Sequence, residues 1–119
     1  MCKSTLKNFD RFRISKDVLE SIGEVLAHAF PPGEGLGGDV HFDDDERWDI
    51  RPIPQVSTGA NFPWVVLHEI GHAVGLGHSL NSSSIMWPIE EEFSGPLRLT
   101  EDDIEGVQVV LSYFFGGRK

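Results

Sequence analysis

The spacing of three histidines between positions 68 and 78 is the feature that most constrains how this chain can fold. His68 and His72 are four residues apart, so on a helix both imidazoles would project from one face at neighbouring heights. Gly75 follows three residues later, and a glycine there can adopt the left-handed conformation that ends a helix. The chain would then turn so that His78 can return to the other two. The pattern predicts a helix, a sharp stop and three imidazoles that meet.

The residues around these histidines predict the same helix independently. Asn61 can cap its start, and Pro63 suits a first helical turn. Between positions 64 and 74 the sequence contains no helix breaker except Gly71. Two glycines then stop it, so a helix over residues 64–76 is expected.

Three neutral imidazole nitrogens and one open position are the ligand set of a catalytic zinc rather than a closed structural one. Glu69 is rotated by about 100° from His68 around the helix, so it can reach a water at the metal without ligating the metal. Its expected role is general base: it takes a proton from the water that attacks a peptide carbonyl and returns it to the leaving amine. The motif therefore predicts peptide-bond hydrolysis.

Length, charge and composition limit the number of domains and the kinds of partner that this chain can have. A chain of 119 residues suits one domain. The formal net charge of −9 argues against nucleic acid as a partner. No stretch approaches the ~20 apolar residues that span a bilayer, and the first residues lack the apolar region of a signal peptide. The single Cys2 cannot form an internal disulfide, so cysteine usage leaves the redox compartment open.

The rest of the chain divides into three pieces. Ser15 can cap a helix that runs toward residues 26–30, with its apolar residues on one side. Residues 31–63, rich in Pro and Gly, are expected to be loops around one strand, Asp39 to Phe42.

A last helix is predicted to begin at Thr100, which forms a near-match to a capping box with Asp103. An apolar stripe along this helix is expected to be core. The stripe consists of Ile104, Val107, Leu111 and Phe114.

The motif matches the signature of the metzincin zinc peptidases, and Ser84 to Pro88 resembles their methionine turn, with Met86 as its apolar floor. Within that clan Ser79, directly after the third histidine, resembles the matrixins. The stretch from Leu26 to Trp48 is similar to matrixin catalytic domains nearly residue by residue. Residues 99–108 resemble their final helix.

This resemblance implies an α+β fold: a metzincin-like core with a small residual sheet, an active-site helix and a C-terminal helix. It would occupy residues 26–115 as a partial catalytic domain, after a divergent segment, residues 1–25. The implied function is a zinc-dependent endopeptidase acting on extracellular-type protein or peptide substrates. The implied location is extracellular, although this chain shows no signal peptide. Nothing in the sequence indicates an oligomeric state.

The resemblance also implies further metal sites. His28 and His41 correspond to two ligands of a second, structural zinc. Calcium ligands would come from two oxygen-rich loops, namely Gly35, Gly37 and Asp39 in the first and Asp43 and Glu46 in the second. Matrixins place a His, an Asp and a calcium loop just before Leu26, and residues 14–25 show none of these. The second zinc is therefore expected to be weak or empty, because it lacks two of its four ligands.

Four residues are implied to contact substrate. Leu26 and Ala27 lie on the strand that pairs with an extended substrate in relatives. Trp64 matches a position that shapes the primed-side pocket, where so large a ring suggests a shallow pocket. Pro88 is also implied to contact substrate. Glu90 stands where relatives usually have a tyrosine in the pocket wall.

Two hypotheses from different classes follow. The first is an active matrixin-type endopeptidase. The alternative is a catalytically incompetent fragment or degenerate paralogue that retains zinc binding, since the opening strands, first helix, propeptide and haemopexin-like region of matrixins are not recognisable here. Another metzincin family is disfavoured by Ser79 and by residues 26–48.

Overall fold

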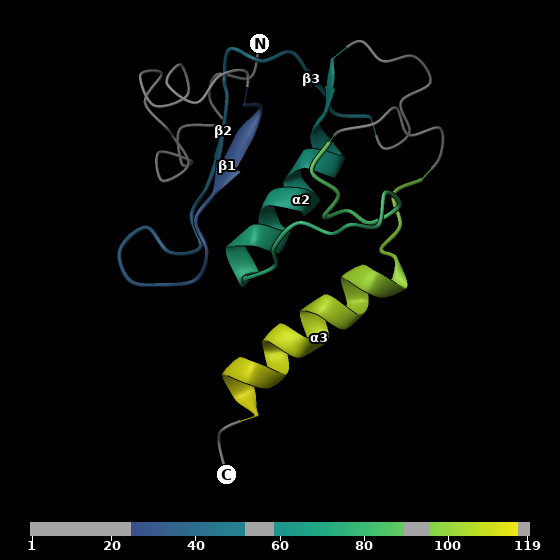
Figure 1. Cartoon of the computed structure of the whole chain (residues 1–119). Coiled ribbons are helices and arrows are strands. Elements are labelled where there is room, and N and C mark those ends of the chain that lie inside the picture. The colour runs from purple at the N-terminus through teal and green to yellow at the C-terminus, as the bar shows by residue number, and fades with distance from the viewer. Residues whose placement is uncertain (1–24, 52–58, 90–95, 117–119) are drawn as a thin grey trace.

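The computed structural model describes residues 25–51, 59–89 and 96–116, which form a small α+β unit. Its elements, in chain order, are β1 (Ala27–Ala29), β2 (Val40–Phe42), β3 (Trp48–Asp49), β4 (Ala60–Asn61), α2 (Phe62–Val74) and α3 (Glu101–Phe115). Helix α2 lies between the β1–β2 pair and the chain that returns after it, and α3 lies below α2 (Figure 1). The predicted α+β class, with two helices and little sheet, is confirmed.

Strands β1 and β2 form an antiparallel pair in which His28 lies directly opposite His41. Beyond the strands, Phe30 N donates to Asp39 O at 2.9 Å, which continues the pairing into the loop. The predicted strand at residues 39–42 is therefore confirmed. The helix predicted from Ser15 lies mostly outside the described residues, and where its predicted course reaches them the structure has strand β1 instead. A second pair, β3 with β4, is parallel and only two residues long, and the sequence did not predict it.

The predicted capping residues of α2 are confirmed, although the helix spans Phe62–Val74 rather than the expected residues 64–76. Asn61 Oδ1 accepts a hydrogen bond from Trp64 N at 3.1 Å, and a proline stands in the first turn. At the other end Gly75 has φ 113°, in the left-handed region. Leu76 N then donates to Gly71 O at 2.8 Å, which satisfies a carbonyl of the last turn.

The described core joins three parts of the chain. Its buried cluster consists of Ala27 from β1, Trp64 and Val65 from α2, and Ile85 from the loop after α2. Partly buried apolar residues pack around it: Leu26, Phe42, Trp48 and Leu97. The first turn of α2 and the returning loop are therefore fixed against the same cluster.

Helix α3 has the predicted start. Thr100 Oγ1 accepts from Asp103 N, and the Asp103 carboxylate accepts from Thr100 N at 2.7 Å, so the capping box is complete. The apolar stripe of this helix was predicted to be core, and that prediction is wrong for three of its four residues, while Val107 is partly buried. Ile104, Leu111 and Phe114 are 41%, 48% and 51% exposed.

The reason is that α3 approaches the rest of the described chain with a neighbouring face. Gly106 lies against Leu76, and the Val110 side chain lies beside Gly75 at the end of α2. Asp103 is buried on the same face. A rotation of about 100°, one residue along the sequence, separates this face from the predicted stripe. None of the described helices combines the length and apolar character needed to cross a bilayer.

Candidate metal centre

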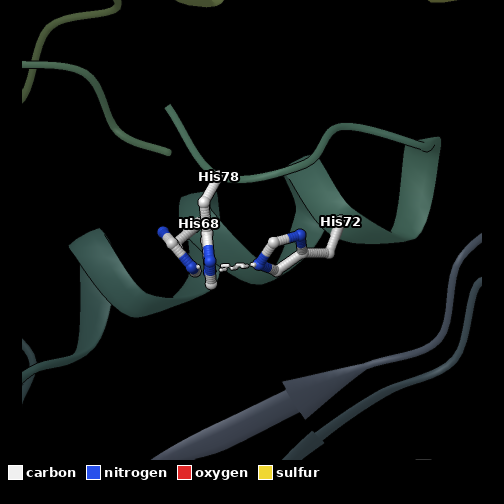
Figure 2. Close-up of side chains that lie close together, drawn as sticks. All are labelled: His68, His72 and His78. Carbon is white, nitrogen blue, oxygen red and sulfur yellow. Dashed lines mark hydrogen bonds between the residues drawn. The ribbon is translucent and has the colours of Figure 1, made fainter. Parts of the chain in front are cut away.

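The three histidines of the motif meet as predicted. His68 and His72 project from α2, His78 comes from the loop that returns over it, and the rings turn toward one another (Figure 2). The His72 Nε2 atom lies 3.1 Å from His68 Nε2 and 3.1 Å from His78 Nε2. Among the residues the structure describes, this is the one group of three or more His, Cys, Asp or Glu side chains placed to hold a metal ion.

Backbone carbonyls fix which nitrogens face the centre. His68 Nδ1 lies 2.7 Å from Ile85 O, and His72 Nδ1 lies 2.8 Å from Leu76 O. A carbonyl oxygen only accepts, so Nδ1 carries the proton in both rings and Nε2 presents its lone pair. Burial lowers the pKa of His68 and of His78, which favours neutral imidazoles.

This donor set fits zinc. The unprotonated Nε2 atoms of His68 and His72, 3.1 Å apart, repel one another unless a cation lies between them. Zinc binds imidazole at about 2.0–2.1 Å in tetrahedral geometry, which corresponds to a nitrogen–nitrogen separation of about 3.3 Å. Hydrogen bonds from the second ring nitrogen to carbonyls are the usual support of zinc-binding histidines. The structure therefore presents a site whose spacing and protonation suit Zn²⁺.

Glu69 follows the first of these histidines on α2 and is buried, with 7% of its surface exposed. Burial raises the pKa of its carboxyl group to about 7. A carboxyl group with such a pKa can both accept and return a proton near neutrality. Its assignment as general base stays a prediction, to which burial adds a physical basis.

Met86 packs against the middle of α2. It is 4% exposed, and a Cβ added at Gly71 would overlap its sulfur atom. Gly71, read from the sequence only as a possible helix breaker, is therefore the place where the returning loop touches the helix between His68 and His72. The role of Met86 as a floor for the metal stays a prediction.

Asp103 links α3 to this loop, a role that the sequence did not reveal. Its carboxylate accepts from Ser84 Oγ at 2.5 Å and from Ile85 N at 3.2 Å, in addition to its capping bonds with Thr100. The carbonyl of Ile85 in turn holds His68. Burial alone would raise the pKa of Asp103, but the hydrogen bonds from Ser84, Thr100 and Ile85 outweigh it, so its pKa lies below the usual value.

The residue after the third histidine makes three hydrogen bonds. Ser79 N donates to Met86 O at 2.8 Å, and Ser79 Oγ donates to Asp102 Oδ2 at 2.5 Å. The same hydroxyl accepts from Asn81 N at 3.0 Å. From the sequence Ser79 is recognisable only as a family marker, because the sequence does not show which distant carboxylate its hydroxyl will meet.

The predicted substrate residues lie in different surroundings. Trp64 is 3% exposed, and its ring stacks on His68 with centroids 4.9 Å apart and planes at 25°. Leu26 and Ala27 enter and begin β1, and Ala27 is part of the buried core. Pro88 is exposed on the returning loop. Glu90 lies outside the described residues, and all four substrate assignments stay predictions.

The predicted second zinc site has two of its residues side by side. His28 and His41 are cross-strand partners, and the Phe30 ring contacts both, with centroids 4.7 and 5.7 Å away. The described ranges hold no third metal-binding side chain grouped with them. Asp10 and Asp17, two carboxylates of the N-terminal segment that could substitute for the missing ligands, lie outside those ranges. A weak second site stays a prediction.

The predicted calcium residues occupy two loops. Gly35, Gly37 and Asp39 lie between β1 and β2, where Gly35 has φ 71°. After β2, Asp43 Oδ1 accepts from Asp45 N and Glu46 Oε1 accepts from Arg47 N, both at 2.9 Å. The two carboxylates thus serve local turns, and calcium binding stays a prediction.

Comparison with known proteins is consistent with this centre. The family model described as Matrixin matches residues 7–112. The chain is 48% identical to stromelysin-1 of Equus caballus over 88 residues, which cover 72% of this chain and 17% of the relative. It is 49% identical to matrilysin of Rattus norvegicus over 87 residues, covering 72% and 31%, and 43% identical to matrilysin of Homo sapiens over 98 residues, covering 82% and 35%.

The chain therefore spans between about a sixth and about a third of the length of these relatives. The family match begins at residue 7, before the Leu26 at which the sequence resemblance was placed, and the domain boundary at residues 25 and 26 stays a prediction. With a family match over most of its length and three histidines gathered at one point, this chain belongs to the matrixin family.

Proposed function

We propose that this chain is the zinc-holding core of an endopeptidase that hydrolyses peptide bonds in extracellular protein or peptide substrates. One observation carries the proposal. Three imidazoles converge through Nε2, while carbonyls of Ile85 and Leu76 hold the Nδ1 atoms of two of them. The Nε2 lone pairs of His68 and His72 repel one another at this distance unless a cation lies between them, and the His78 Nε2 atom lies within reach of the same ion.

His68, His72 and His78 would hold the zinc ion. A zinc ion at this position would supply Lewis acidity, which polarises a peptide carbonyl and makes water easier to deprotonate. Glu69 takes the proton of the attacking water and transfers it to the leaving nitrogen, for which its pKa of about 7 is suited. Trp64 covers one face of the His68 ring and shields it from water.

The position of strand β1 is evidence that the substrate is a peptide. Within the described residues it pairs only with β2, so its other edge is not paired with a strand there. An exposed strand edge can bind an extended peptide through backbone hydrogen bonds. Strand β1 also packs against α2, which carries Glu69 and two of the histidines. A peptide on this edge would run alongside that helix.

The test is to compare zinc content and peptidase activity in purified protein and two variants. The parent should bind about one zinc and cleave an unstructured protein substrate. Glu69→Ala should keep the zinc and lose at least about 100-fold in activity, since general acid–base catalysis contributes that much or more. His72→Ala should lose both. Zinc binding without turnover in the parent would instead support the alternative, a zinc-binding fragment or degenerate paralogue.

A further inference from the structure

The third histidine is supported differently from the other two. His68 and His72 are carried by α2 and hold carbonyls through Nδ1. His78 lies past the end of the helix and is exposed. The position of His78 depends on the conformation of the loop, and hydrogen bonds of the next residue, Ser79, fix that conformation.

Two hydrogen bonds of Ser79 connect it to different parts of the chain. The backbone bond from Ser79 N to Met86 O closes the loop on itself at 2.8 Å. The side-chain bond from Ser79 Oγ to Asp102 Oδ2 joins the loop to α3, 23 residues away in sequence, at 2.5 Å. Hydroxyl-to-carboxylate bonds are short and roughly twice as strong as neutral ones.

Asp102 is well placed to act as a fixed support. It stands in the first turn of α3, directly before the buried Asp103, whose capping box and bonds to Ser84 fix that turn. The Ser79–Asp102 bond and the Ser84–Asp103 bond therefore both join α3 to the same loop, one at each end of it. Asp103 holds the end near Met86, and Asp102 holds the end next to His78.

We propose that Asp102 is a positioning residue which, through Ser79, holds His78 at the third metal position. The inference rests on the proposed zinc site and extends it to a residue outside the motif. The ordinary alternative is that Asp102 belongs to a solvated acidic run that also contributes charge to the helix N-terminus. In that case Glu101, in the same turn, would be equivalent to it.

The experiment measures the Zn²⁺ dissociation constant of the whole chain by competition with a chromogenic chelator. Ser79→Ala and Asp102→Ala should each weaken binding by about tenfold, the usual effect of removing a support of a metal ligand. Asp102→Asn retains an acceptor oxygen and should stay within about threefold of the parent. Glu101→Ala removes the same charge from the same turn and should leave the affinity unchanged.

A second arm tests whether the effect passes through His78. In a His78→Ala background, which leaves two histidines, adding Asp102→Ala should cause no further loss of zinc affinity. A residue that merely stabilised the fold would weaken the remaining two-histidine site as well. Far-UV circular dichroism of each variant checks that α3 is formed, and Ser79→Ala, which deletes one oxygen atom, decides the matter if Asp102→Ala is unfolded.

Three results would overturn the proposal: parental affinity in Ser79→Ala, an equal loss in Glu101→Ala, or an undiminished effect of Asp102→Ala without His78. If the parent binds zinc and the variants do not differ, only this inference fails. If the parent chain binds no zinc, the proposed function fails with it. The two failures are therefore distinguishable from one set of titrations.

Discussion

Gly71 shows how a single position without a side chain shapes the centre. A Cβ there would overlap the Met86 sulfur atom, so the Met86 side chain packs directly against α2 where Gly71 leaves room for it. We predict that Gly71→Ala lowers the free energy of unfolding by about 1–3 kcal/mol, the usual cost of overpacking. Gly77→Ala is the matched control, because an added Cβ there meets nothing within 4 Å.

Urea unfolding followed by circular dichroism measures both variants. The midpoint should fall for Gly71→Ala and change little for Gly77→Ala. Equal midpoints would mean that Met86 moves aside at no cost, and the close contact would then have no energetic weight.

Asp103 gives the stability of the chain a defined dependence on pH. Hydrogen bonds lower its pKa below the ordinary 3.8 in the folded state. A carboxyl group with a lowered folded pKa contributes stability that is fully present above the unfolded pKa and is lost as pH falls below it. We predict that Asp103→Asn lowers stability at neutral pH and makes unfolding less sensitive to pH below about 4.

The measurement is the urea midpoint at a series of pH values between about 3 and 7, which bracket the ordinary carboxyl range. The curves of the parent and of Asp103→Asn should converge as the pH falls. Parallel curves would show that the buried carboxyl group does not titrate differently on folding.

The two faces of α3 should differ in their tolerance of substitution. Gly106 faces Leu76, whose carbonyl holds His72, whereas Leu111 is 48% exposed. We predict that Gly106→Leu destabilises the chain by about 1–3 kcal/mol and weakens zinc binding, because the helices must separate. Leu111→Gln should stay within about 0.5 kcal/mol of the parent, as surface substitutions do.

Chemical unfolding and zinc competition on the two variants provide the readout. Had the apolar stripe been core, as its spacing predicted, the order of the two effects would be reversed. That reversed order is the outcome that would contradict the packing of α3 described above.

The same element shows what the sequence could and could not predict. Asn61, Gly75 and Thr100 act on backbone groups within a few residues, so the ends of α2 and the start of α3 were predictable. The side of α3 that is buried depends on the small Gly106 accepting Leu76, a contact between distant segments. Local periodicity favoured the more apolar stripe instead.

The candidate site likewise contains residues that the sequence could predict and residues that it could not. The histidines were predictable because a helix with a fixed stop determines their relative positions. Asp102 and Asp103 were not, since a capping box accounts for Asp103 and a solvated acidic run accounts for Asp102, and neither gives a reason to look for partners in the loop.

For the whole molecule, the metal should act as a stabilising ligand. His68 and His72 lie on α2, and His78 lies on the loop that Asp103 and Ser79 tie to α3, so a bound ion would link these parts. Any ligand that binds only the folded state stabilises it by mass action, by about 2.7 kcal/mol at 100 times its dissociation constant. We predict that zinc raises the melting temperature and that a chelator reverses the rise.

Differential scanning fluorimetry with and without zinc tests this prediction. His72→Ala, which lacks one ligand, should show little or no zinc-dependent shift. A shift of the same size in that variant would place the stabilising ion elsewhere, with the His28 and His41 pair as the first position to examine.

The bonds of Asp103 also set an order of events during synthesis. Ile85, whose carbonyl orients His68, is held by a carboxylate 18 residues further along the chain. While the ribosome is still adding those residues, the histidines have been made but the contact that orients the first of them has not. Zinc that binds before this point would meet mobile ligands. Full zinc affinity is therefore expected only after α3 has been synthesised and its capping box has formed.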